Sequence, residues 1–440
     1  MRKIVIIGNG ISGITCARHI RKSCNDQITI ISSETEHFYS RTALMYVYMG
    51  HMKYDHLKPY EDFFWKKNRL DLIHDRVTRI DTQTRQLHLE KSKLIDYDTL
   101  IIASGSKTKK YGWPGQDLTG VAGLYNYQDL QQIELQTKNI SSAVIAGGGL
   151  IGVELAEMLH TREIEVTLLV RDKYYWGSVL PVDDGKLVGK HIEAHGIKII
   201  YETELKEVIG NVQGEVSMIM TNTGELIKCE FVGITTGVVP NIDFLIDSGI
   251  ETSKGILIDQ YFQTNIENVY AIGDCAEFKE SVKGRKSIEQ IWYTGRMHGE
   301  TLAQTICGNR KKYSPGPFFN SAKFFDLEYQ TYGIVPSKFS DEENYFHWHH
   351  PCKEIAITFV YENQTKLFKG LNCFGTRLRH ENFDQWLKEG VSVDHVIANF
   401  SDALFDKEFT KGYLDDLISA YNSKTGSTIK KMKNKFFNFT

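Results

Sequence analysis

The chain contains 440 residues, and its 52 basic and 55 acidic side chains give a formal charge of −3. This near balance argues against a nucleic-acid partner, because nucleic-acid-binding proteins usually carry a basic surface. Hydrophobic residues make up 41% of the chain and aromatic residues 12%, which excludes a disordered protein, and the length allows two or three domains.

The sequence also bears on location and on metal or disulfide content. No apolar run approaches the roughly 20 residues of a transmembrane helix, and Met1, Arg2 and Lys3 lead directly into an apolar strand without space for a signal peptide. We therefore expect a cytoplasmic protein without a transmembrane segment. The seven cysteines are scattered and form no C-x-x-C pair, so we expect neither a disulfide framework nor a bound metal.

One pattern occurs twice in the chain: an apolar strand, a glycine turn and a helix. The first copy predicts a strand over residues 3–7, a turn with Gly8, Gly10 and Gly13, a helix, and a second strand over residues 27–31. In such a βαβ unit the glycines permit a tight turn and the close approach of a pyrophosphate, while the helix N-terminus offers free N–H groups.

An acidic residue follows the second strand of this first copy. Glu34 lies about 20 residues beyond the last glycine of the turn, where an acid can hydrogen-bond a ribose hydroxyl. The first unit therefore fits the adenosine part of a dinucleotide. Further along the chain, an apolar strand over residues 99–103 ends at Ser104 and Gly105.

The second copy repeats the unit. It predicts a strand over residues 142–146, a turn with Gly147, Gly149 and Gly152, a helix, and a strand over residues 166–170. Because each copy has a strand before the turn and a helix after it, the two copies predict two bound nucleotides.

Arg171 stands where the second copy would need an acid to bind a ribose hydroxyl. An arginine at this position can instead pair with the 2′-phosphate of NADPH; the alternative is an ordinary solvated residue.

A later strand over residues 268–272 runs into Gly273 and Asp274. Asp274 thus lies at the carboxyl end of a strand, where open α/β sheets bind ligands. After Pro315 the glycine turns become fewer and aromatic residues cluster. We predict an α/β fold with two Rossmann-like dinucleotide-binding domains and an α+β C-terminal domain.

The paired turns, the strand end at Ala103 and the sequence from Thr264 to Asp274 resemble the pyridine nucleotide–disulfide oxidoreductase superfamily. The resemblance implies FAD at the first turn, NAD(P)H at the second, and a hydrogen bond from the ribityl and pyrophosphate region of FAD to Asp274. It also implies that Glu154, in the helix after the second turn, is a catalytic residue near the nicotinamide and flavin rings. The expected cofactor-binding residues are Gly8, Gly10, Gly13, Glu34, Arg41, Ser104, Gly105, Gly147, Gly149, Gly152, Arg171, Gly237, Gly273 and Asp274.

The same resemblance suggests three domains. We expect an FAD-binding domain over residues 1–112 and 246–313, an NAD(P)-binding domain over residues 113–245, and a C-terminal interface or acceptor domain over residues 314–440.

The segment that holds a redox-active cysteine in disulfide reductases has none in this chain. It contains the sequence Tyr39-Ser40-Arg41, which is similar to the branch without this cysteine: rubredoxin reductases, ferredoxin reductases and apoptosis-inducing-factor-like proteins. Several of those proteins carry a lysine where this chain has Tyr46, so their lysine–glutamate pair is incomplete at Glu154.

We therefore expect an FAD-dependent NAD(P)H oxidoreductase that passes electrons to a small carrier protein of the ferredoxin or rubredoxin type, without a redox disulfide. Two alternatives remain open: an NAD(P)H quinone reductase or oxidase, and a flavin-bound redox-sensing interaction protein. A homodimer is compatible with the resemblance.

Two features lie in the C-terminal region. Of the sequence His347-Trp348-His349-His350, only His347 and His349 share a face of a strand, so we expect a surface strand rather than a metal site. The tail over residues 430–439 mixes lysine with phenylalanine. It is compatible with peripheral contact to an anionic membrane or an acidic protein; the alternative is a frayed terminus.

Overall fold

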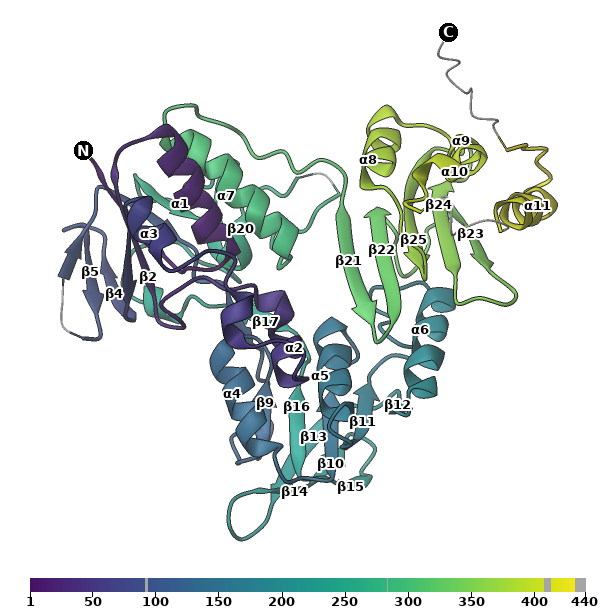
Figure 1. Ribbon diagram of the computed structural model, residues 1–440, viewed down its shortest axis with the longest axis horizontal. Coiled ribbons are helices and arrows are strands. Elements are labelled where there is room, and N and C mark those ends of the chain that lie inside the picture. Colours follow the sequence, from purple (N-terminus) through teal and green to yellow (C-terminus); the bar gives the residue numbers. More distant parts are fainter. Residues whose placement is uncertain (92–93, 283, 407–412, 432–440) are drawn as a thin grey trace. The chain divides into compact units, whose positions relative to one another are not determined.

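The computed structural model describes the whole chain except residues 92–93, 283, 407–412 and 432–440 (Figure 1). The basic and aromatic tail falls largely outside the described residues. The chain separates into two compact units, the first comprising Met1–Leu169 and Thr203–Pro315, and the second comprising Val170–Glu202 and Gly316–Thr440. The division into three domains stays a prediction.

A parallel five-stranded sheet in the first unit contains the first glycine turn. Its strand order is β19-β7-β1-β2-β3. The strands are β1 (Lys3–Ile7), β2 (Gln27–Ser32), β3 (Leu70–His74), β7 (Thr99–Ile102) and β19 (Val269–Ala271). The central strands β1 and β7 read as continuous apolar runs because both faces of a parallel sheet are covered.

Helix α1 (Ile11–Ser23) follows β1 and packs beside α7 (Trp292–Ile306), as Figure 1 shows. The two backbones approach closely at Gly299, where a Cβ would lie 2.5 Å from the carbonyl oxygen of Ser12. A glycine is therefore needed at this crossing.

A second parallel sheet in the first unit contains the strands β11-β10-β16-β9, in that order. Their bounds, with those of the accompanying helices, are β9 (Val121–Gly123), α4 (Tyr127–Gln136), β10 (Ser142–Ala146), α5 (Leu150–His160), β11 (Glu165–Val170) and β16 (Phe231–Ile234). Each glycine turn thus joins a central strand of a parallel sheet to a helix.

Short elements complete the first unit. The helices are α2 (Leu44–Tyr48) and α3 (Phe63–Lys67), and the strands are β4 (Val77–Asp81), β5 (Gln86–Leu89), β6 (Leu94–Asp96), β8 (Ser106–Thr108), β13 (Leu205–Gly210), β14 (Val216–Thr221), β15 (Leu226–Lys228), β17 (Val238–Pro240), β18 (Ile256–Ile258) and β20 (Ala276–Phe278).

The second unit contains an antiparallel sheet in the order β21-β22-β25-β24-β23. The strands of this sheet are β21 (Phe319–Phe324), β22 (Leu327–Gly333), β23 (Glu343–His349), β24 (Ala356–Glu362) and β25 (Phe368–Phe374). The other helices and the other strand of the second unit are α6 (Val182–Ala194), β12 (Lys198–Tyr201), α8 (His380–Glu389), α9 (Val393–Ala398), α10 (Phe400–Ala403) and α11 (Leu414–Thr425). Helices α8 to α11 belong to the same unit as this sheet (Figure 1), and the buried residues of these helices form one hydrophobic core with those of the sheet.

The predicted fold class is confirmed, since both glycine turns lie in parallel α/β sheets and the C-terminal region is α+β. The strand predicted at His347 and His349 is present as β23, the edge strand of its sheet, and His349 is exposed as expected. The prediction of a surface position does not hold for His347, whose side chain is 18% exposed and lies 3.3 Å from the buried Asp184 carboxylate. No helix of the described residues is both long and apolar enough to cross a membrane.

Candidate functional site

Two glycines of the first turn are required by the backbone. Gly8 has φ +109°, and a Cβ there would lie 2.1 Å from the carbonyl oxygen of Ala103. A Cβ at Gly13 would lie 2.2 Å from the carbonyl oxygen of Gly8. These distances leave no space for a side chain, so both residues let strand β1, helix α1 and the end of β7 approach each other.

Gly10 differs from these two residues. It is the N-cap of α1 with φ −70°, and a Cβ there would meet no atom within 4 Å. Helix α1 has neither a side-chain cap nor an acidic residue in its first turn. The first N–H groups and the positive end of the helix dipole are thus available at an open position, which fits a pyrophosphate group.

A cavity of about 780 Å³ opens at this helix end. Its size lies within the range of about 300–1,000 Å³ typical of ligand sites. It is lined by residues from both glycine-turn units of the sequence, which include Gly8, Gly10, Glu34, Phe38, Tyr39, Arg41, Met45, Ser104, Gly105, Leu150, Glu154, Val238, Gly273, Asp274 and Gln290. The structure therefore brings most of the predicted FAD-site residues to one cavity.

Asp274 lies at the wall of this cavity. Its carboxylate accepts a hydrogen bond from the Tyr125 hydroxyl at 3.2 Å, and burial raises its pKa above the usual value. The same hydroxyl accepts from the backbone N–H of Ser106 at 2.8 Å. Tyr125 is not among the residues predicted from the sequence, because no local pattern marks a tyrosine whose partners lie far along the chain.

Glu34 is paired with Arg41. Arg41 Nη1 and Nη2 donate to the two carboxylate oxygens at 3.0 and 2.6 Å, and the Tyr39 hydroxyl and Tyr127 N–H also donate to Oε1. Burial alone would raise the pKa of Glu34, but Arg41 and the other donors hold it below its usual value. Within the described part of the chain, Oε2 accepts from Arg41 alone, so it retains acceptor capacity for a ribose hydroxyl.

Ser104, Gly105 and Gly273 also line the cavity. The Ser104 hydroxyl donates to the carbonyl oxygen of Asn241 at 2.7 Å. Gly105 has φ +69° and Gly273 has φ +76°, and a Cβ at Gly273 would lie 2.4 Å from Ser12 Oγ. These residues hold the backbone close to the N-terminus of α1.

The second turn has the same construction as the first. Gly147 has φ +122° and a Cβ there would lie 2.5 Å from the carbonyl oxygen of Thr235, while a Cβ at Gly152 would lie 2.1 Å from that of Gly147. Gly149 is the N-cap of α5, which also lacks a side-chain cap and an acidic residue in its first turn. The N-terminus of α5 is thus also suited to binding a phosphate group.

Glu154 is the ionisable residue of α5 that lines the cavity. Among the described residues, none donates a hydrogen bond to its carboxylate or forms an ion pair with it. Burial, and to a smaller extent the negative charge of Glu157, raise its pKa to about 7. A carboxyl group that exchanges its proton near neutral pH is typical of a functional site.

Arg171 and Gly237 lie outside the set that lines the cavity. The Arg171 side chain is 66% exposed, and its Nε lies 3.9 Å from Asp172 Oδ1. Gly237 has φ +114° and open space at its Cβ position, and its carbonyl oxygen accepts from the backbone N–H of Lys109 at 3.0 Å.

The seven cysteines all belong to the described part of the chain; none of them lines the cavity, and all are free. Residues of the segment that would hold a redox-active thiol, among them Phe38, Tyr39, Arg41 and Met45, form part of the cavity wall. Burial raises the pKa of the Cys16 and Cys275 thiols, which disfavours the reactive thiolate form.

Comparison with known proteins gives the following similarities. Residues 2–299 match the family model described as pyridine nucleotide-disulphide oxidoreductase. Over 313 residues the chain is 30% identical to an NADH-rubredoxin oxidoreductase from Clostridium acetobutylicum, an alignment that covers 71% of this chain and 76% of that protein.

A further relative is the assimilatory nitrate reductase electron transfer subunit of Bacillus subtilis, which is 28% identical over 310 residues. The alignment covers 70% of this chain but only 39% of that longer protein. Among solved structures, the fold is similar to that of a ferredoxin reductase from Rhodopseudomonas palustris, with a TM-score of 0.78, 21% identity, and coverage of 85% of this chain and 91% of the other.

Proposed function

The chain belongs to the pyridine nucleotide-disulphide oxidoreductase family, and we propose that it passes electrons from NAD(P)H through FAD to a small carrier protein of the ferredoxin or rubredoxin type, without a redox disulfide. Proteins of this family bind FAD and use NAD(P)H. The observation that carries the proposal is the cavity, which is lined by the first glycine turn, Asp274 and Glu154 but by no cysteine.

FAD fits the residues at the first turn. The open position at Gly10 and the uncapped N-terminus of α1 suit its pyrophosphate, Glu34 Oε2 has capacity for a ribose hydroxyl, and the buried Asp274 carboxylate can accept from the ribityl hydroxyls. When bound there, the flavin supplies the redox chemistry, taking up a hydride and releasing electrons singly.

NAD(P)H is assigned to the second turn through Gly147, Gly149 and Gly152. Glu154 comes from the helix that follows this turn and reaches the cavity lined by the first turn. We assign it the catalytic role: its carboxylate, when ionised, would place a negative charge beside a nicotinamide bound at this turn and would stabilise the positive charge that hydride donation creates.

The carrier is proposed from two considerations. All seven cysteines are described and none of them lines the cavity, so a thiol relay is not expected there and electrons would leave from the bound flavin itself. The similarity to an NADH-rubredoxin oxidoreductase and to a ferredoxin reductase supports a one-electron carrier as the acceptor. The cytoplasmic location and the three-domain division remain part of this proposal.

The experiment is a set of steady-state assays with purified, FAD-loaded protein. NAD(P)H oxidation is measured with a ferredoxin, a rubredoxin, ferricyanide, a quinone, oxygen and a disulfide substrate, with the Gly10→Val variant as the flavin-deficient control. We expect turnover with the carriers and ferricyanide and none with the disulfide. Turnover that is fast only with quinone or oxygen would favour the quinone reductase or oxidase alternative, and slow turnover with every acceptor would favour the redox-sensing one.

A further inference from the structure

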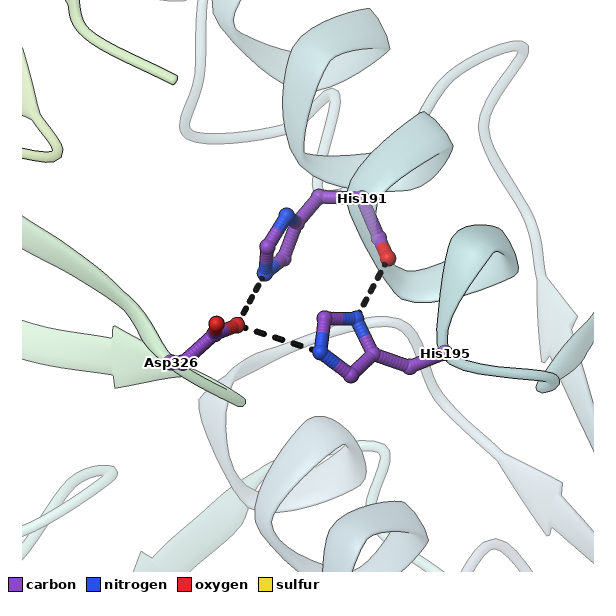
Figure 2. A group of neighbouring side chains, drawn as sticks. All are labelled: His191, His195 and Asp326. Atoms are coloured by element: carbon purple, nitrogen blue, oxygen red, sulfur yellow. Dashed lines mark hydrogen bonds and ion pairs between the residues drawn. The ribbon is translucent and has the colours of Figure 1, made fainter. Parts of the chain in front are cut away.

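A cluster of two histidines and one aspartate belongs to the second unit, whereas the cavity is lined by residues of the first unit. His191 lies in the last turn of α6, and His195 directly follows the helix (Figure 2). The spacing of four residues places both on one face of the helix. Asp326 lies in the tight turn between β21 and β22, and the ligand atoms of the three side chains all lie within 4.8 Å of one another.

Both imidazoles point their Nε2 atoms at one carboxylate oxygen. Asp326 Oδ1 is 2.8 Å from His191 Nε2 and 3.1 Å from His195 Nε2, as Figure 2 shows. The other ring nitrogens also face acceptors: His191 Nδ1 is 3.2 Å from Glu354 Oε1, and His195 Nδ1 is 2.9 Å from the carbonyl oxygen of His191.

The four contacts need more N–H donors than two neutral imidazole rings supply. A neutral imidazole has one N–H donor, yet all four ring nitrogens face oxygen atoms that only accept. If each ring carries its proton on Nδ1, the Nε2 atoms of His191 and His195 each direct a lone pair at the Asp326 carboxylate oxygen. A divalent cation among these three atoms would replace the two missing protons and carry the same charge.

The surroundings favour a metal over a chance contact. Metal-binding histidines usually donate their second N–H to a carboxylate or a backbone carbonyl, which fixes the ring orientation. Glu354 Oε1 can accept this hydrogen bond from His191, and the backbone carbonyl oxygen of His191 can accept it from His195. The His191 side chain is only 5% exposed, and Phe325 stacks on the His195 ring with centroids 4.6 Å apart, which holds that ring in place.

We propose that His191, His195 and Asp326 bind one divalent transition-metal ion of the zinc class, with Glu354 as the hydrogen-bond acceptor that orients His191. Two imidazoles and a carboxylate suit Zn²⁺ at about 2.0–2.2 Å and do not suit Mg²⁺ or Ca²⁺, which prefer oxygen ligands alone. Three protein ligands leave one position for water or another donor. The ion would join the end of α6 to the β21–β22 turn.

The sequence holds a signal for this site in the H-x-x-x-H spacing of His191 and His195. The third ligand is 135 residues from His191, so its approach depends on the fold. The cluster also differs from the His347 to His350 run, in which His347 and His349 lie on the edge strand β23 and His350 directly follows it.

The test uses the full-length, FAD-loaded protein after removal of metal with EDTA. Zn²⁺ is titrated against a chromophoric chelator, and Co²⁺ is added as a spectroscopic probe. We compare wild type with His195→Gln and Asp326→Asn, both at partly or largely exposed side chains, and with His349→Gln, an exposed control on β23.

We expect one bound Zn²⁺ per chain, visible Co²⁺ absorption bands, and a melting temperature that rises with Zn²⁺. His195→Gln and Asp326→Asn should each weaken binding by at least about tenfold, and the control should not. The Glu354→Gln variant should bind Zn²⁺ more weakly while keeping its stoichiometry of one. Absence of Zn²⁺ binding by folded wild type, or equal affinity in wild type and the two ligand variants, would overturn the proposal.

Discussion

Arg41 donates from both terminal nitrogens to the carboxylate of Glu34, at 3.0 and 2.6 Å. Arg41 Nη1 also donates to the carbonyl oxygen of Tyr125 at 2.6 Å, and the Tyr127 N–H donates to Glu34. The ion pair therefore ties the segment after β2 to the start of α4, and it holds the wall of the cavity that we assign to FAD.

We predict that Arg41→Leu lowers the free energy of unfolding of the flavin-free protein by about 2–3 kcal/mol at pH 7, since it leaves Glu34 largely buried without its cation; the partial exposure of the pair reduces the loss. The double variant Arg41→Leu/Glu34→Gln should recover part of this loss. Urea unfolding measures both, and equal stability of wild type and Arg41→Leu would contradict the role given to the pair.

The same pair has a pH dependence of known sign. The pKa of Glu34 is lower in the folded protein than the usual pKa of a glutamate. The ion pair therefore stabilises the fold at pH values above the usual glutamate pKa, and this stabilisation is lost as the pH falls through the pKa that Glu34 has in the folded protein. The stability difference between wild type and Arg41→Leu should therefore shrink on acidification from pH 7 toward pH 3. A difference that stays constant over this range would show that the pair does not cause it.

Gly10 and Gly13 provide a matched pair of substitutions. Gly10→Val places its side chain in open space at the cavity, so the protein should fold but copurify with little FAD. Gly13→Val pushes a side chain against the carbonyl oxygen of Gly8 and should destabilise the protein itself. Flavin absorbance per folded chain and the melting temperature distinguish the two effects. A Gly10→Val protein with full FAD content would contradict the placement of the pyrophosphate.

The choice of reductant is predicted from Arg171. Its guanidinium can form a charge-assisted contact with the 2′-phosphate of NADPH. Position 171 itself is not acidic, and the nearby Asp172 carboxylate lies 3.9 Å from Arg171 Nε. We expect wild type to prefer NADPH, and Arg171→Ala to reduce that preference by roughly tenfold, equal to about 1.4 kcal/mol. The ratio of kcat/KM for the two cofactors is the measurement. The same ratio in both proteins would mean that Arg171 does not recognise the phosphate.

Glu154 should give the reaction a pH dependence near neutrality. Its raised pKa of about 7 means that it is ionised above this value and neutral below it. Because the ionised form stabilises the positive nicotinamide product, we expect flavin reduction in wild type to accelerate as pH rises through about 7. Glu154→Gln, fixed in the neutral state, should keep the low-pH rate throughout. Stopped-flow reduction between pH 6 and 8 tests this, and identical profiles in the two proteins would exclude the role.

The parts of the site that could be predicted from the sequence are local. Gly8 and Gly13, like Gly147 and Gly152, occur at fixed spacing between a strand and a helix, so the strand and helix patterns alone identify the turns. In both turns these glycines let two backbone segments pass so closely that a Cβ would clash with a carbonyl oxygen.

The parts that could not be predicted depend on partners brought together by the fold. The Tyr125 hydroxyl reaches Asp274 across 149 residues, and the Tyr127 N–H reaches Glu34 across 93. The contact between His191 and Asp326 is of the same kind. A tyrosine or an aspartate in a loop has many local roles, and only the tertiary structure selects among them.

The central claim is that electrons leave from the flavin without a thiol relay, and a cysteine-free variant tests it most directly. The buried Cys16, Cys229, Cys275 and Cys373 are replaced by alanine, and the half-buried or exposed Cys24, Cys307 and Cys352 by serine. The measurement is the rate of NAD(P)H-driven reduction of ferricyanide and of a ferredoxin-type protein by the folded, FAD-replete variant. We predict that it keeps most of the wild-type rate with both acceptors. A variant that still takes up hydride from NAD(P)H but no longer reduces either acceptor would place a thiol on the electron path and contradict the claim.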